Sequence, residues 1–248
     1  MTVREIHGSK MGGPASRNLA TNAPPAPDGL APGLNHPVVF ATLLTAISGF
    51  LDAAAFVELN RLYVSFMSGN STHLGMALAA AAFPQALAIV AIIAAFVVGA
   101  GMGTWIADNL PRHLPVSVVG VEAAILLAAL VLMRSDQPLV ALTLVGLSMG
   151  MQNVLHQIVA KADVGKSFIT GALFGLGQSM ARMLRVPGAT RQALSNLLSW
   201  SAFVAGAAAG AATLTWFGLT ACLLVALSAM LALLGALLVK KGLLAVRS

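Results

Sequence analysis

The sequence predicts an all-α, polytopic helical membrane protein, and three observations carry this prediction. Of the 248 residues, 58% are hydrophobic and only 9% are charged, whereas soluble proteins carry about 25% charged residues. The mean hydropathy is correspondingly high, at +0.88. Long apolar segments recur along nearly the whole chain, as membrane-spanning helices require. The alternating segments of about ten residues that are typical of a membrane β-barrel do not occur.

The apolar segments define the organisation of the chain. Residues 1–36 are rich in Pro, Gly and Ala and contain no apolar run, so we expect a disordered cytoplasmic tail and not a signal peptide. We assign residues 37–240 to a single helical membrane domain and residues 241–248 to a cytoplasmic C-terminal tail. Prolines and charged residues divide the domain into eight apolar segments, which are approximately 37–59, 65–82, 85–107, 115–133, 138–160, 167–184, 194–216 and 219–239.

Two of these segments, 65–82 and 167–184, are marginal for crossing a hydrocarbon core of about 30 Å. Each contains glycines and several hydroxyl or amide side chains. The chain therefore has either six spans and two short re-entrant helices, or eight spanning helices. With a cytoplasmic N-terminus, the basic residues left outside are Arg61, Arg112, Lys161 and Lys166 for eight spans, but only Arg61 and Arg134 for six. The positive-inside rule thus favours six spans, and both arrangements place both termini in the cytoplasm.

Colinear sequence matches predict two related halves, about 37–133 and 138–239. If each half has three spans the repeats are inverted, and if each has four they are parallel. The matching blocks are 49–52 with 150–153, 65–69 with 167–171, and 96–103 with 203–210.

Three polar positions in the apolar segments are candidates for an ion or substrate pathway. Asp52 lies deep in the first span, where an acid costs about 2.5–3.5 kcal/mol on insertion scales. It is therefore protonated, hydrogen-bonded, or paired with a transported cation, or it braces a neighbouring helix. Its repeat partner Asn153 shares a helix face with His156, which fits either a pathway or interhelical hydrogen bonds. Glu122, in the fourth apolar segment (115–133), is a second candidate for proton exchange.

The starts of the two short segments are the other candidate positions. Ser68, Gly69 and Asn70 begin the first segment, and Thr170 begins the second. If these helices start within the membrane, their N-termini present partial positive charge to an anion or a polar ligand. If they span it, the same residues are ordinary helix caps.

Other chemistries lack a sequence signal. There is no Walker motif, HExxH or GxSxG, and the single Cys222 lies in an apolar segment. We therefore expect no enzyme activity, no metal and no cofactor. The basic residues sit in tails and short loops without interleaved aromatics, so nucleic acid is not an expected partner.

The stretch Ser48-Gly49-Phe50-Leu51-Asp52-Ala53, followed by residues 63–70 (Tyr-Val-Ser-Phe-Met-Ser-Gly-Asn), resembles the YoaK-like family of bacterial integral membrane proteins, domain of unknown function 1275. The likeness covers about residues 38–240, and Ser68 stands where the family more often has Thr. The resemblance implies a bacterial inner-membrane protein of several helices, and it implies no substrate or activity.

Two functional hypotheses follow from these observations. The first is a secondary transporter or channel-like permease for a small polar solute, proton-coupled through Asp52. The second is a non-transporting assembly or sensor protein whose buried polar residues only brace helix packing. The expected partners are the lipid bilayer and a small polar solute or proton, and the sequence leaves homo-oligomerisation open.

Overall fold

The protein is a multi-pass helical membrane protein. A computed structural model describes residues 37–160 and 168–245, and every regular element in these two ranges is helical. The predicted tail at 1–36 lies outside the described residues. The elements are α1 (Pro37–Glu58), α2 (Met67–Ala79), α3 (Phe83–Asn109), the short 3₁₀ helix η1 (Pro111–His113), α4 (Leu114–Met133), α5 (Pro138–Ala160), α6 (Phe168–Arg182) and α7 (Ala189–Ala245).

Prolines mark the starts of the long helices. Pro37 and Pro138 are the first residues of α1 and α5, and prolines occupy the first turns of α3 and α4. A proline is tolerated there because the first N–H groups of a helix have no intrahelical partner. The prolines that separate the apolar segments in the sequence therefore begin the following helix. At the other end of the chain, α7 continues to Ala245, past the boundary predicted at residue 240.

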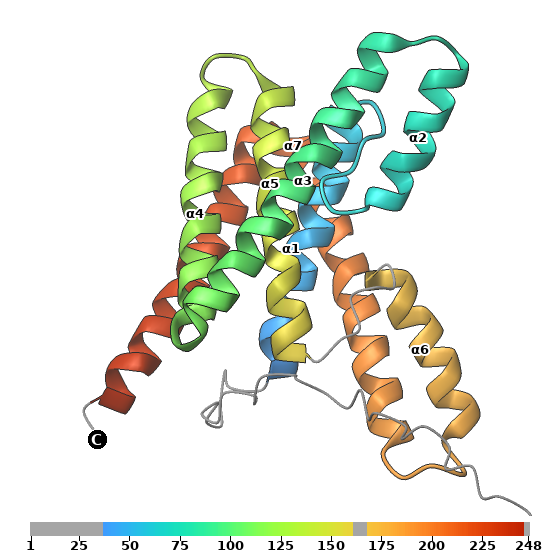
Figure 1. Ribbon diagram of the computed structural model, residues 1–248, viewed down its shortest axis with the longest axis vertical. Helices are drawn as coiled ribbons and strands as arrows, with labels where there is room; N and C mark the ends of the chain where they lie inside the picture. The colour runs from blue at the N-terminus through green and yellow to red at the C-terminus, as the bar shows by residue number, and fades with distance from the viewer. Residues whose placement is uncertain (1–36, 161–167, 246–248) are drawn as a thin grey trace, which may run out of the picture.

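Helix α7 folds back on itself at Gly218. Its 57 residues would measure about 86 Å if straight, roughly three times the thickness of the hydrocarbon core. Gly218 has φ 77° and ψ 175°, a conformation that is open to glycine and strained for other residues. Beyond it, the Cys222 thiol donates to the carbonyl oxygen of Gly210 at 3.8 Å, although twelve residues of straight helix would span about 18 Å. Figure 1 shows the two arms, orange and red, as an inverted V.

The long segments and the short helices differ clearly in length. Within the part of the chain that the structure describes, five helices are long and apolar enough to cross a membrane. The last of these is the folded α7, so six long segments result. Helices α2 and α6 have 13 and 15 residues, or about 20 and 22 Å, too short for a core of about 30 Å. This is the arrangement of six long segments and two short helices that the sequence favours.

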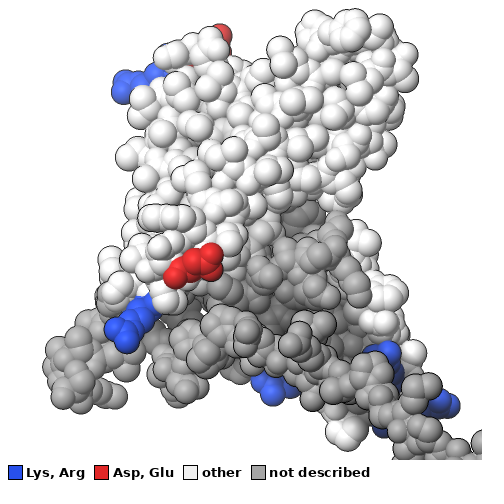
Figure 2. Space-filling model, viewed as in Figure 1, with Lys and Arg blue, Asp and Glu red and all other residues white. Residues whose placement is uncertain are grey.

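The short helices lie at opposite ends of the molecule. In Figure 1, α1 rises to the end from which α3 descends, and α2 lies beside that end, whereas α6 lies near the opposite end. Helix α1 begins and α7 finishes at the lower end of the same view. Figure 2 shows that the charged side chains on this face lie towards the ends of the helices, with a broad uncharged surface between them. Such a surface fits contact with lipid.

Two pairs of helices cross with their backbones in direct contact, and glycines make this contact possible. In the first pair, α1 with the first arm of α7, a Cβ at Gly206 would overlap the carbonyl oxygen of Ala46. In the second pair, α3 with α5, a Cβ at Gly99 would overlap that of Leu147. Such approaches supply packing contacts between helices in lipid.

In each crossing, a second glycine one helical turn further along makes the same kind of contact with the partner backbone. A glycine on the partner helix makes the reverse contact. Gly210 meets Phe50 and Gly103 meets Met151 in the forward direction, and the reverse contacts are Gly49 with Phe203 and Gly150 with Phe96. Along the two forward contacts of each pair the residue numbers increase together, and in Figure 1 the two helices of each pair run in the same direction.

Replacing Gly99 by alanine should destabilise the protein, because the new methyl group would force α3 away from the Leu147 carbonyl. We expect a loss of about 1–3 kcal/mol, as for other overpacked interiors, measured by thermal unfolding in detergent. Gly101 on the same helix is the matched control, since no described atom lies within 4 Å of its Cβ position. Gly101→Ala should be neutral or stabilising by up to about 1 kcal/mol. Equal effects of the two substitutions would contradict the contact.

Cysteine labelling tests the course of α2 in the membrane. In a Cys222→Ala background, Glu58→Cys at the end of α1 and Ala80→Cys after α2 should react with an impermeant maleimide from the same side. Asp108→Cys at the end of α3 should react from the other side. All three positions are exposed, so reactivity reports sidedness and not burial. Reaction of Glu58→Cys and Ala80→Cys from opposite sides would mean that α2 crosses the membrane.

Candidate functional site

Among the described residues, two groups of buried or partly buried polar side chains are considered as candidate sites. The first, here called the loop clamp, consists of Asp52, Ser65 and Asn70 around the loop between α1 and α2. The second, here called the core polar group, consists of Ser48, Glu122 and Gln152 from α1, α4 and α5. Five of these six side chains are buried, and Ser65 is partly buried.

Asp52 uses both carboxylate oxygens to hold the loop. Oδ1 accepts hydrogen bonds from the backbone N–H groups of Val64, at 2.8 Å, and Ser65, at 2.7 Å. Oδ2 accepts from the Ser65 hydroxyl. Since Asp52 is only 2% exposed, these bonds replace its solvation by water.

Asn70 completes the clamp from the first turn of α2. Its Oδ1 accepts from the Tyr63 N–H at 2.9 Å, and its Nδ2 donates to the Tyr63 carbonyl at 2.7 Å. Three successive loop residues are therefore held by side chains on the two flanking helices. Val64 is fully buried among core residues of α1, α4 and α5, so the loop runs into the bundle and not over its surface.

Aromatic packing explains Gly69. The Tyr63 ring lies against Phe56, with centroids 4.9 Å apart, and meets Phe66 edge-on at 5.2 Å. A Cβ at Gly69 would press into the rings of both Phe66 and Tyr63. Glycine thus allows α2 to begin directly beside the ring cluster.

The clamp changes what the N-terminus of α2 can bind. The Asp52 carboxylate accepts the N–H groups immediately before this helix, where the helix dipole favours a negative charge. The sequence suggested that this helix N-terminus could bind an external anion. In the structure, the carboxylate of Asp52 already lies beside it. Ser68 is exposed, and no side chain caps α2.

The core polar group contains a carboxyl without a partner. The Ser48 hydroxyl lies 2.8 Å from Gln152 Oε1 and 3.0 Å from the Leu44 carbonyl. Gln152 also lies next to the Glu122 side chain, but the two side chains do not form a hydrogen bond of regular geometry. Both Glu122 oxygens and Gln152 Nε2 consequently have no hydrogen-bond partner among the described residues, although Glu122 is fully buried.

The sequence-predicted residues do not form one site. Asp52, Gly69 and Asn70 surround one loop, whereas Glu122 belongs to the core polar group. Asn153 is half-buried and donates to the Met149 carbonyl of its own helix at 3.0 Å. His156 is buried, and Thr170 at the start of α6 is exposed.

Sequence reasoning missed Ser48, Ser65 and Gln152. Ser48 precedes Asp52 by one helical turn, so the i, i+4 spacing on α1 could have indicated it. The same spacing relates Gln152 to His156, and these two side chains lie with Ser148 on the buried polar face of α5, whereas Asn153 is half-buried. Ser65 carried no signal of its own beyond its place in the repeated block.

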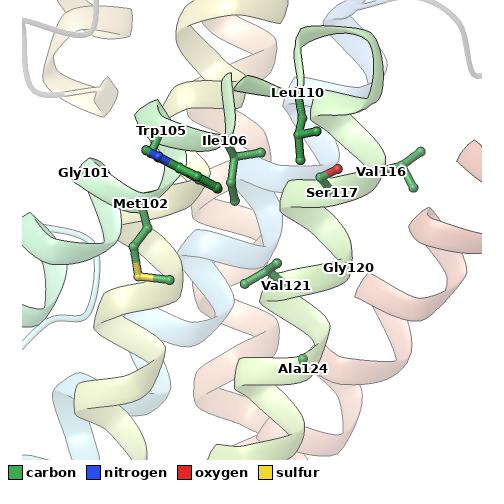
Figure 3. Close-up of a pocket in the computed structure, with 10 residues that line it drawn as sticks. All are labelled: Gly101, Met102, Trp105, Ile106, Leu110, Val116, Ser117, Gly120, Val121 and Ala124. Carbon is green, nitrogen blue, oxygen red and sulfur yellow. The ribbon is translucent and has the colours of Figure 1, made fainter. Parts of the chain in front are cut away.

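Two grooves lined by described residues are apolar and separate from both polar groups. Figure 3 shows one between α3 and α4, with Trp105 and Met102 on one wall and Val121 on the other. Its volume is about 840 Å³. A second groove of about 530 Å³ lies between α1 and the two arms of α7. No residue of the loop clamp or the core polar group lines either groove, so they suit lipid chains better than a polar solute.

Metal binding has no support in the described part of the chain. Within residues 37–160 and 168–245, no group of three or more His, Cys, Asp or Glu side chains could hold a metal ion. The expectation from the sequence that the protein needs no metal stays a prediction.

The family model described as "Protein of unknown function (DUF1275)" matches residues 40–237. The chain belongs to this family. In this DUF1275 protein the match covers all six long segments and both short helices, which confirms the family resemblance seen in residues 48–53 and 63–70. The YoaK likeness stays a resemblance. No curated protein and no solved structure matches the chain.

Substitutions at Asp52 separate its role as a hydrogen-bond acceptor from its charge. Asp52→Ala leaves the N–H groups of Val64 and Ser65 buried without an acceptor, at a cost of roughly 1–3 kcal/mol each. Asp52→Asn keeps one oxygen for both groups, and the Ser65 hydroxyl can turn to accept from the new amide. We therefore expect a large loss of stability for alanine and a small one for asparagine.

The measurements are thermal unfolding and hydrogen exchange across residues 60–70. Asp52→Ala should accelerate exchange in this loop, and Asp52→Asn should leave it close to wild type. If asparagine proved as damaging as alanine, the negative charge and not the acceptor geometry would be the property that matters.

Proposed function

We propose that this protein is a secondary transporter for a small polar solute, built from two inverted repeats that work by alternating access. The observation that carries the proposal is the exchange of helix contacts between the two halves. The contact of Gly49 with Phe203 corresponds, under the sequence matches, to that of Gly150 with Phe96. Each crossing joins the first long helix of one half to the second long helix of the other.

The positions of the short helices support inversion. Helices α2 and α6 follow the first helix of their respective halves, and they lie at opposite ends of the molecule (Figure 1). Helices α1 and α5, which begin the halves, run in opposite directions in the same view. Interrupted segments at corresponding positions of inverted halves are typical of transporters and indicate where the substrate site lies.

The crossings also suggest which parts move together. The α1–α7 unit consists of α1, α6 and the first arm of α7, and the α3–α5 unit consists of α2, α3 and α5; within each unit the helices are in direct contact. Each unit contains segments from both halves of the sequence. In this proposal the two units rock against each other, and the Asp52 bonds to Val64 and Ser65 link them.

The basic residues support an orientation. Arg112, Arg182, Arg185 and Arg191 follow α3 or flank the α6–α7 connection, which is the end where α1 begins and α7 finishes. Arg61 and Arg134 lie in connections at the other end. By the positive-inside rule we place the first end in the cytoplasm of a bacterial inner-membrane protein.

One observation favours the second hypothesis, a non-transporting assembly or sensor protein. The hydrogen bonds of Asp52 and Asn70 all go to the neighbouring loop or to Met67 within α2, and both side chains are buried. These two residues therefore brace the fold. A static scaffold also requires only such bracing. The two hypotheses therefore differ in whether the two helix units move against each other.

Distances between spin labels test for alternating access even while the solute is unidentified. In full-length protein in nanodiscs, with Cys222→Ala, labels at Met76 on α2 and Met180 on α6 report on the two units. We expect two resolved distance populations whose weights change with a bound solute or with pH. The control pairs, Met76 with Leu87 and Met180 with Leu198, each lie within one unit and should give one constant distance. All four positions are exposed.

A single narrow Met76–Met180 distance under every condition would favour the scaffold. A thermal-shift screen of small polar solutes then identifies the substrate class, because a ligand that binds the folded state raises its stability by mass action.

A further inference from the structure

We propose that Ser48, Glu122 and Gln152 form a proton-binding site in the core of the bundle, with Glu122 as the group that gains and loses the proton. The inference rests on the proposed transport function only for its purpose, which is to couple a proton to the movement of the two units. Its chemistry follows from the side chains alone.

The isolation of Glu122 is the first argument. It is fully buried, and neither carboxyl oxygen has a hydrogen-bond partner among the described residues. A buried carboxylate without a partner costs several kcal/mol, and a membrane interior holds such a group mainly where it has a function. The Glu122 carboxyl lies next to the Gln152 side chain, whose Nε2 is likewise without a partner.

The surroundings of Glu122 contain few other titratable groups. Helix α4 packs against α3, α5, α7 and η1. The buried titratable groups on these neighbours are His156 on α5 and Cys222 on α7, and the Cys222 thiol donates to a backbone carbonyl. The remaining groups on these elements whose side chains the structure describes, Asp108 on α3, Arg112 and His113 on η1 and Arg191 on α7, are exposed. No cation on these elements reaches Glu122 as a salt-bridge partner within the described residues.

The hydrogen bonds of Ser48 are the second argument. A hydroxyl has one hydrogen, yet Ser48 lies within hydrogen-bond distance of two acceptors, Gln152 Oε1 and the Leu44 carbonyl. The nitrogen and oxygen of an amide are interchangeable in position by rotation. The pair Ser48 and Gln152 therefore has two consistent arrangements.

Each arrangement suits one protonation state of Glu122. When the carboxyl is neutral, its O–H donates to Gln152 Oε1, Gln152 Nε2 donates to Ser48, and Ser48 donates to Leu44. When the carboxyl has released its proton, the amide turns, Nε2 donates to the carboxylate, and Ser48 donates to Gln152 Oε1. One O–H bond forms or breaks on Glu122, and the proton passes to or from water admitted when the units separate.

The location links this exchange to movement. Ser48 belongs to the α1–α7 unit and Gln152 to the α3–α5 unit, so their hydrogen bond crosses the boundary between the units. Separation of α1 from α5 breaks that bond and frees the amide to turn. The protonation state of Glu122 thereby biases one arrangement of the units over the other, which is the physical requirement for coupling.

Infrared difference spectroscopy on full-length protein in nanodiscs tests the site directly. Between about pH 4 and pH 10, a range that covers ordinary and buried carboxyls, we expect a carbonyl band of a neutral carboxylic acid to vanish as pH rises. Glu122→Gln should abolish this band. Gln152→Leu should shift it to higher frequency, because the acid loses its acceptor, and Ser48→Ala should give a smaller shift. Glu58→Gln, which replaces an exposed carboxyl, is the control and should leave it unchanged.

A band that is insensitive to Glu122→Gln, or a Glu122 carboxyl that stays neutral across the range, would overturn the proposal. If Glu122→Gln does not fold, the absence of any shift in Gln152→Leu overturns it equally. The spin-label distances are independent of this measurement. If Glu122 titrates while the Met76–Met180 distance stays fixed, transport is refuted and the proton site is retained. If two distance populations occur while Glu122 does not titrate, transport is retained and the proton site is refuted.

Discussion

The rest of the structure depends on the direct backbone contact in the two glycine crossings. Lipid offers little hydrophobic gain when helices associate, so packing at short range has to hold them together. Gly206 against Ala46 and Gly99 against Leu147 supply this contact in α1 with α7 and in α3 with α5. Because each crossing joins segments far apart in the sequence, it also sets the topology. The polar groups lie between these crossings, and their geometry follows from where the crossings place α1 and α5.

The two polar groups show how different neighbours give similar residues different roles. Asp52 and Glu122 are both buried acids in apolar helices. Asp52 meets a loop with free N–H groups and becomes a structural acceptor. Glu122 meets side chains that leave its oxygens without partners among the described residues, and this leaves it available for a proton. The interior therefore separates a structural acid from a chemical one, although position within a helix makes them look equivalent.

The sequence predicted the architecture better than the polar contacts. Apolar segment length identified the short helices, and the glycine blocks that predicted repeats are the residues at the crossings. The break between segments 194–216 and 219–239 falls at Gly218, where α7 turns. In contrast, nothing local distinguishes Gln152 from Asn153 as the inward amide, because the rotation of α5 is set by Gly150 against Phe96. Likewise, the partner of Asp52 is a loop whose path into the bundle depends on the burial of Val64, and no sequence pattern within α1 indicates that path.

The fold at Gly218 has a consequence for biogenesis. A single residue joins the two arms of α7, and the chain has no extramembrane connection there. During synthesis, the first arm therefore cannot insert on its own and be followed by a soluble loop before the second arm inserts. We therefore expect the two arms to enter the lipid as one helical hairpin, and the turn between them offers neither a protease nor an antibody a loop to bind.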